Sequence, residues 1–336
     1  MAEPPASAKR AALVYNPVKV ADAAWLRQQV QLESEKAGWR EPLLLETTID
    51  DPGQGVTRDA LEQGVDVVLV AGGDGTVRCV SEAMNTTGVP LAIVPSGTGN
   101  VLARNIKLPL TRPDLMVRSA IDGGDIVPID VGVAKLKREN GDIEEHAFVV
   151  MAGIGLDAAM IANTSAKLKK RVGWVAYVDG AARSLPSAKP FHTVWQRTGG
   201  KLHSANVQSL LFANCGTLTL GIDILPNASI ADGSIDLAVV QPSGPLGWVN
   251  VARRISILNS PLRKTKVGRR MAGKRVTNKR KNTSILYESG DGFEAAVSEP
   301  HSVELDGDEF GEAVRIYCRV SPGGLLVVVP KGHLIR

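Results

Sequence analysis

Hydrophobic and polar residues alternate in the first third of the chain in blocks that predict strands and helices in turn. Four apolar runs have the length of strands, at 13–16, 42–46, 65–73 and 90–97. The intervening segments predict helices at 21–38, at 56–63, from about 76 and at 100–106. Runs this apolar are typical of a parallel sheet that is covered on both faces. The first part of the chain therefore predicts a doubly wound α/β domain.

The pattern changes near residue 126, where short β-rich runs separated by turn residues take over. Helical patterns interrupt these runs at 156–185 and at 247–259. Many short strands with frequent turns are typical of an antiparallel β-sandwich. The fully apolar run at 323–330 is of the same type as the strands of the first part. We therefore expect two domains, residues 10–126 completed by 322–336, and residues 127–321.

Composition supports this division and excludes several classes of protein. The chain has 336 residues, of which 44% are hydrophobic and 22% charged, which fits two folded domains rather than a fibrous or disordered chain. The apolar stretch 147–162 is too short for a membrane helix and contains Asp157. The first ten residues have no apolar signal core, so we expect a cytoplasmic protein. Three widely spaced cysteines predict reduced thiols at Cys79, Cys215 and Cys318.

Positive charge is concentrated in one segment. The net charge is +4, yet residues 263–281 contain ten Lys or Arg and no acid, so the rest of the chain is net acidic. Such a block can meet phosphates, nucleic acid or an anionic lipid surface, or it can be a solvated loop. The segment has no aromatic residue on which bases could stack, so we expect no nucleic-acid partner.

Two glycine-rich loops carry the strongest chemical signal. Gly72–Thr76 follows one buried strand and opens a helix, and Ser96–Asn100 follows the next strand. Glycines there let backbone N–H groups approach phosphate oxygens, and a helix N-terminus adds a positive dipole. Ligands of open α/β sheets bind at this carboxyl edge. The alternative is a pair of tight turns capped by Asp or Thr.

Two common nucleotide motifs do not match. Arg78 stands where a GxGxxG fingerprint has its third glycine. Residues 268–275 resemble a Walker A loop, but Arg275 replaces the Ser or Thr that binds magnesium, and no hydrophobic strand precedes the segment. The loops therefore do not define a conventional dinucleotide or P-loop site.

Five motifs in order are similar to the diacylglycerol kinase catalytic domain family, which includes bacterial lipid kinases and sphingosine kinases. They are Asn16-Pro17, GGDGT at 72–76 with PSGTGNVLAR at 95–104, AGIGLDA at 152–158, ADGSID at 231–236 and Asp306-Gly307-Asp308. GGDGTVR and PSGTGN are most similar to the actinobacterial branch. The resemblance implies a nucleotide domain, a C-terminal β-sandwich and an ATP site in the cleft between them.

The implied activity is an ATP- and Mg²⁺-dependent transfer of phosphate to a hydroxyl of diacylglycerol or a related lipid, which forms phosphatidic acid. Phosphoryl transfer needs positioning and charge neutralisation, so glycine loops and a few carboxylates suffice. The basic segment 263–281 would then dock the enzyme peripherally on an anionic membrane, where near-surface Lys or Arg contribute about 1 kcal/mol each.

The resemblance also assigns roles to single residues. Asp308 would accept the proton of the lipid hydroxyl, Asp74 would act near the magnesium that bridges the phosphates, and Asp130 would belong to the same magnesium and water network. A second, structural magnesium would be held by Asp232 with Ser229 and Ser234. ATP would be bound by Asn16, Thr48, Gly72, Gly73, Asp74, Gly75, Thr76, Val77, Arg78 and Thr98.

Several alternatives stay open. Val18-Lys19-Val20 follows Asn16-Pro17 where the family often has Ser-Gly, which leaves that loop's nucleotide contact undecided. Thr47 competes with Thr48, and Glu309 competes with Asp308 as the base, although neighbouring strand residues point to opposite faces. An NAD kinase shares GGDGT, and a catalytically silent nucleotide- or lipid-binding protein is a third reading. The lipid, its acyl chains and the oligomeric state, a homodimer included, are not decided by the sequence.

Overall fold

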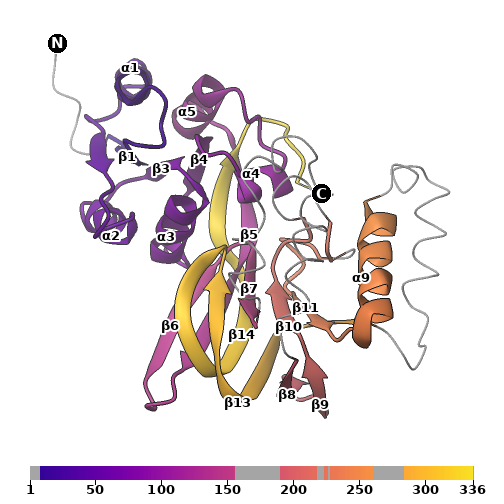
Figure 1. The fold of residues 1–336 in the computed structure, drawn as a ribbon. Coiled ribbons are helices and arrows are strands. Elements are labelled where there is room, and N and C mark those ends of the chain that lie inside the picture. The colour runs from indigo at the N-terminus through magenta and orange to yellow at the C-terminus, as the bar shows by residue number, and fades with distance from the viewer. Residues whose placement is uncertain (1–7, 156–189, 218–222, 226–227, 260–283, 336) are drawn as a thin grey trace.

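The computed structural model describes residues 8–155, 190–217, 223–225, 228–259 and 284–335 (Figure 1). Its N-terminal half is built on four parallel strands in the order β2-β1-β3-β4. Both β1 and β3 are buried along their whole length, as their apolar sequences predict. The four strands are β1 (Ala11–Tyr15), β2 (Leu43–Glu46), β3 (Val67–Gly72) and β4 (Leu91–Pro95).

Helices cover both faces of this sheet. Contacts join α1 to α5 and α2 to α3, and these two pairs lie apart in Figure 1. The described helices of this half are α1 (Ala23–Lys36), α2 (Gln54–Glu62), α3 (Asp74–Met84), α4 (Val101–Asn105) and α5 (Pro113–Ile121). The sequence pattern placed the start of α3 near Thr76, but the helix begins at Asp74. It did not predict α5, which begins with a proline, a residue favoured in the first helical turn.

The C-terminal half is an antiparallel β structure joined to the same sheet. Two of its long strands, β5 (Asp125–Lys137) and β14 (Asp308–Val329), pair with each other over most of the length of β5. The end of β14 turns to parallel pairing with β4, at Val327 and Leu91. β14 therefore connects the two halves, as the long yellow strand in Figure 1 shows.

The remaining strands enclose a second core that contains Phe148, Phe212 and Phe293. They are β6 (Ile143–Phe148), β7 (Met151–Ile154), β8 (Phe191–Arg197), β9 (Leu202–Val207), β10 (Ser209–Ala213), β11 (Ile235–Val240), β12 (Ile285–Gly290) and β13 (Gly292–Leu305), with helix α9 (Gly244–Leu258) following β11. The predicted fold class, an α/β domain followed by an antiparallel β-sandwich, is confirmed.

Some predictions fall outside the described residues. These are the helix at 156–185, the end of the AGIGLDA motif and the basic segment 263–281 with its Walker-like match. Cys79, Cys215 and Cys318 are buried and free of disulfides. Within the described part of the chain, no helix has both the length and the apolar character that a membrane crossing requires.

Candidate active site

The two glycine loops meet at the carboxyl edge of the parallel sheet. Gly72, at the end of β3, is in register with Pro95, at the end of β4. A Cβ atom on Gly97 would lie only 3.0 Å from the Cα of Gly73 and 3.3 Å from the carbonyl oxygen of Gly72. The expected convergence of the loops is therefore present, and the absence of a side chain at Gly97 allows it.

Asp74 joins the loops from the first residue of α3. Its Oδ1 accepts a hydrogen bond of 2.6 Å from the backbone N–H of Val101, which begins α4. The N-cap residue of α3 is Gly73, which has no side chain with which to cap the helix. A helix start without a capping side chain presents backbone donors and a positive dipole end, which together suit a phosphate.

Asp308 faces this helix start from the C-terminal half. It is the first residue of β14, and a Cβ atom on Gly75 would lie 3.1 Å from its Oδ2. The Asp308 side chain is 46% exposed, so a substrate can reach it. Its neighbour Glu309 is exposed and pairs in register with Glu304 of β13. Of the two candidate bases, Asp308 is the one that lies against the glycine loop.

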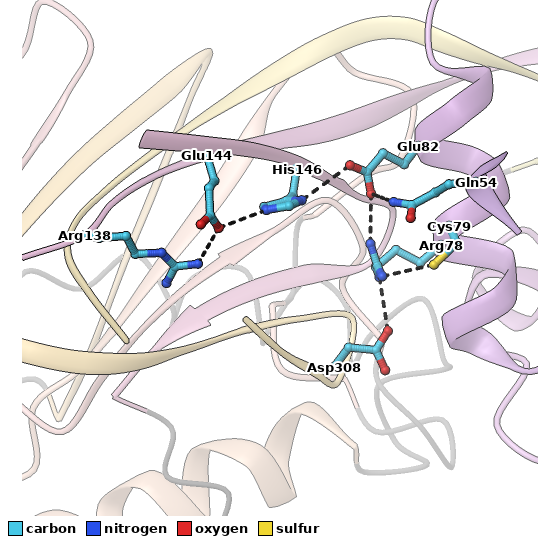
Figure 2. Close-up of polar contacts among 8 residues, drawn as sticks. All are labelled: Gln54, Arg78, Cys79, Glu82, Arg138, Glu144, His146 and Asp308. Atoms are coloured by element: carbon cyan, nitrogen blue, oxygen red, sulfur yellow. Dashed lines mark hydrogen bonds and ion pairs between the residues drawn. The ribbon is translucent and has the colours of Figure 1, made fainter. Parts of the chain in front are cut away.

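Arg78 is buried between α3 and Asp308 (Figure 2). Its Nε donates to Asp308 Oδ2 at 3.2 Å, and its Nη1 pairs with Glu82 Oε2 at 2.9 Å. Its Nη2 lies 3.1 Å from the Cys79 sulfur, and the guanidinium stacks 4.8 Å from the Phe310 ring centre. The side chain of Arg78, a predicted ATP ligand, is thus directed at the proposed base.

Glu82 is held by further donors beside Arg78. Gln54 donates to its Oε2 at 2.9 Å, and the Nδ1 of His146 lies 3.5 Å from its Oε1. Burial alone would raise the pKa of Glu82, but the contacts with His146 and Arg78 outweigh burial and hold the pKa below its ordinary value. Glu82 is therefore an ionised, partly buried link between the helix and the C-terminal strands. The GGDGT motif gave no sign of this residue.

The other predicted nucleotide ligands lie along the same edge of the sheet. Asn16 follows β1, and its Oδ1 accepts from the N–H groups of Val18 and Lys19, so its side chain closes its own turn. Thr98 is exposed on the second loop, and Thr48 is exposed after β2, where its Oγ1 accepts from the N–H of Asp51.

Thr47 and Thr48 have different surroundings. Thr47 is buried, and its hydroxyl has no hydrogen-bond partner among the described residues. Thr48 is exposed and can be reached by a ligand without rearrangement. Exposure therefore favours Thr48 over Thr47 as a nucleotide contact.

Asp130 is placed in a different cluster from Asp308. It is buried in β5, where its Oδ2 accepts from Gly233 N–H at 2.7 Å and its Oδ1 from Gly323 N–H at 2.8 Å. In the described structure no hydrogen bond joins it to Asp74 or Asp308. Asp130 instead links β14 to the loop that contains Asp232.

That loop carries the residues predicted to hold a structural magnesium. Asp232 is exposed and accepts from the N–H of Ser234 at 3.1 Å; Ser229 is also exposed. Although Asp232 is exposed, partial loss of solvent around its carboxyl group raises its pKa, and the neighbouring charge of Asp130 raises it further. Oxygen donors of this kind suit Mg²⁺. Within the described part of the chain, however, no group of three or more His, Cys, Asp or Glu could hold a metal.

Asp306 is a half-buried acid to which the sequence assigned no role. Its carboxylate accepts three backbone hydrogen bonds of 2.8 Å, from Val149, Val150 and Met151. Its φ of 53° is left-handed, which Asp tolerates better than most residues. Burial raises the pKa of Asp306 to about 6, although the three N–H donors act in the opposite direction. By holding the loop between β6 and β7, Asp306 fixes the turn that presents Asp308.

Replacing Asp306 by glycine is expected to destabilise the fold without straining the turn, because glycine tolerates the positive φ. The change leaves three buried N–H groups without an acceptor, each worth about 1–3 kcal/mol. We expect urea unfolding to show a loss of at least about 3 kcal/mol. The exposed control Asp50→Gly should stay within about 0.5 kcal/mol of wild type. Equal stability of Asp306→Gly and wild type would contradict this role.

The structure thus combines an α/β domain, in which two glycine loops converge, with a β domain that presents the carboxylate of Asp308 to the first of them. The diacylglycerol kinase catalytic domain family matches residues 10–134, and the YegS C-terminal NAD kinase beta sandwich-like domain family matches residues 149–329. The chain belongs to this family of kinases, which confirms the resemblance seen in its motifs.

Curated relatives agree with this assignment. The chain is 26% identical to a diacylglycerol kinase of Bacillus subtilis over 331 residues, which cover 96% of this chain and 97% of that protein. It is 29% identical to a diacylglycerol kinase of Mycobacterium tuberculosis over 182 residues, which cover 54% and 57%. A probable lipid kinase YegS-like protein of Pseudomonas syringae is 28% identical over 211 residues, which cover 62% and 64%.

Solved structures share the fold. A putative diacylglycerol kinase from Bacillus anthracis superposes with a TM-score of 0.68 at 19% identity, covering 98% of both chains. Yeast NADH kinase has a TM-score of 0.54 at 10% identity, covering 97% of this chain and 85% of that one. The fold alone is therefore common to kinases with different acceptors.

Proposed function

We propose that this kinase transfers the γ-phosphoryl group of ATP to a hydroxyl of diacylglycerol or a related lipid and so forms phosphatidic acid or its equivalent. The observation that carries the proposal is the placement of Asp308 against Gly75, beside the uncapped start of α3 and the second glycine loop. Donors for a phosphate chain and an acceptor for a proton then face the same space. The names of the relatives support a lipid as the acceptor.

In this proposal the backbone of residues 72–78 binds the phosphates, with Asn16, Thr48 and Thr98 at the same edge of the sheet. Magnesium, held by Asp74, would neutralise charge on the transferring phosphate. Asp308 accepts the proton of the lipid hydroxyl while the hydroxyl oxygen bonds to the γ-phosphorus and the bond to the ADP oxygen breaks. Arg78 orients the carboxylate of Asp308 during this step.

The remaining assignments extend the proposal to the rest of the chain. Asp232, Ser229 and Ser234 would hold a structural magnesium, with Asp130 fixing their loop. The basic segment 263–281 would place the enzyme peripherally on the cytoplasmic face of an anionic membrane. Residues 10–126 with 322–336 would form the nucleotide domain, and residues 127–321 the lipid domain.

A kinase assay with labelled ATP tests the proposal. We expect phosphorylation of diacylglycerol in vesicles, faster in anionic than in neutral vesicles because of the basic segment, and abolished by EDTA. NAD is the matched soluble acceptor, since NADH kinase shares the fold. Formation of NADP in place of phosphorylated lipid would contradict the proposal. ATP binding without phosphorylation of any acceptor in a broad lipid panel would instead indicate a catalytically inactive nucleotide- or lipid-binding protein.

A further inference from the structure

A chain of alternating charges crosses from the C-terminal strands to the helix that bears the phosphate loop (Figure 2). Arg138, the residue that follows β5, contacts Glu144 on β6 at 2.6 Å, and Glu144 lies 3.4 Å from His146 Nε2. His146 lies 3.5 Å from Glu82 on α3. Glu82 then contacts Arg78, which contacts Asp308 on β14. The contacts therefore pass between the two halves of the protein twice, at His146–Glu82 and again at Arg78–Asp308.

The inner members of this chain are shielded from solvent. The side chains of Arg78 and Glu82 are only 7% and 14% exposed, and that of His146 is 25% exposed. Partly buried ion pairs are screened by salt much less than exposed ones. The contacts around Glu82 are therefore strong enough to fix side-chain positions, unlike a typical surface pair.

We propose that His146 is a positioning residue for the phosphoryl transfer, and that it acts through Glu82 and Arg78 to hold the Asp308 carboxylate at the phosphate loop. This inference rests on the proposed function, because it assigns Asp308 the role of base. His146 is not among the residues that the proposed function assigns to ATP or to the lipid hydroxyl.

The hydrogen-bonding capacity of Glu82 explains why His146 matters. Gln54 and Arg78 both bind Oε2, which leaves Oε1 to the imidazole. A doubly protonated ring donates from both nitrogens and satisfies Glu82 and Glu144 together. A neutral ring donates from only one nitrogen and turns a lone pair towards the other carboxylate. Loss of the proton therefore loosens Glu82 and, with it, the guanidinium that orients Asp308.

The surroundings of His146 favour the protonated ring. The charged groups that face it are Glu82 from α3 and Glu144 from its own strand, while the Phe310 ring of β14 lies 4.6 Å away and Ala134 of β5 is its register partner. The hydrogen bond with Glu82 raises the pKa of His146 above 6.5, and it outweighs burial, which acts in the opposite direction. The protonated ring of His146 should therefore hold the Asp308 carboxylate in place at pH values below this raised pKa. The carboxylate should lose its fixed position as pH rises through the pKa of His146.

The test is a pH profile of kcat in vesicle assays of wild type, His146→Gln and Glu82→Gln. We expect wild type to lose kcat on the alkaline side as His146 deprotonates. His146→Gln should have a kcat about 10- to 100-fold lower at pH 6.5, no such alkaline limb, and a smaller change in the KM for ATP. The variant that combines His146→Gln with Glu82→Gln should have a kcat no lower than that of Glu82→Gln alone, because His146 acts only through Glu82.

Two controls separate this inference from a general effect on folding. Glu144→Gln removes one carboxylate from His146 and should move the alkaline limb to lower pH. His192→Gln, on the exposed face of β8, should keep the wild-type profile. Normal wild-type turnover together with an unchanged kcat and limb in His146→Gln would overturn this inference alone. Absence of wild-type turnover would overturn the proposed function and this inference with it.

Discussion

Replacing Asp308 by Asn is expected to lower kcat by about 10²- to 10⁴-fold while ATP still binds. An amide cannot accept the proton of the attacking hydroxyl, but its oxygen can still accept the hydrogen bond from Arg78 Nε, which is 3.2 Å away in the wild-type protein. The geometry around Gly75 is therefore kept and only the proton acceptor is lost. Steady-state kinetics with lipid vesicles, combined with calorimetric titration of an ATP analogue, measure the two quantities separately.

Two neighbouring variants sharpen this prediction. Glu309→Gln alters the exposed acid next in sequence and should retain activity close to wild type. Asp308→Glu keeps a carboxylate, one methylene further out, and should be more active than Asp308→Asn. A large loss of kcat in Glu309→Gln together with a normal kcat in Asp308→Asn would indicate that Glu309 accepts the proton, and would contradict the role given to Asp308.

Closing the space between the glycine loops is expected to have the second large effect. A methyl group on Gly97 would meet the backbone of Gly73 at 3.0 Å and of Gly72 at 3.3 Å, and backbone atoms cannot turn aside as a side chain can. Gly97→Ala should therefore separate the loops, destabilise the protein by about 1–3 kcal/mol, and lower kcat/KM for ATP by about 100-fold.

Gly73→Ala is the matched comparison. A methyl group on Gly73 would meet no atom of a non-neighbouring described residue within 4 Å, and the backbone there is extended, so the described fold accepts alanine. We expect an unchanged melting temperature together with weaker ATP binding, since the methyl group would project into the space assigned to the phosphates. Equal ATP affinity of Gly73→Ala and wild type would show that the phosphates do not approach this loop.

The sequence predicted the part of the site that depends on neighbouring strands. The buried runs that became β3 and β4 placed Gly72–Thr76 and Ser96–Asn100 at one edge, because parallel strands end together. The alternation of side chains along a strand also showed that only one of Asp308 and Glu309 could face the cleft. The resemblance favoured Asp308, and Asp308 is the one that lies against Gly75 in the structure.

The contacts of single side chains could not be predicted in the same way. Arg78 and Asp308 are separated by 230 positions in the chain, and their ion pair depends on how β14 packs against α3. The contact of His146 with Glu82 likewise joins two elements that no local pattern relates. The contacts of the Asp130 carboxylate with the N–H groups of Gly233 and Gly323 were also not visible in the sequence, because they depend on the path of β5 past the Asp232 loop and the end of β14.

The most direct test of the central claim is a crystal structure of the protein with Mg²⁺ and a non-hydrolysable ATP analogue. The account predicts that the γ-phosphate lies at the N–H groups that begin α3, touches the second glycine loop, and faces the carboxylate of Asp308. An analogue bound with its phosphates away from both loops, or with Asp308 turned from them, would contradict it.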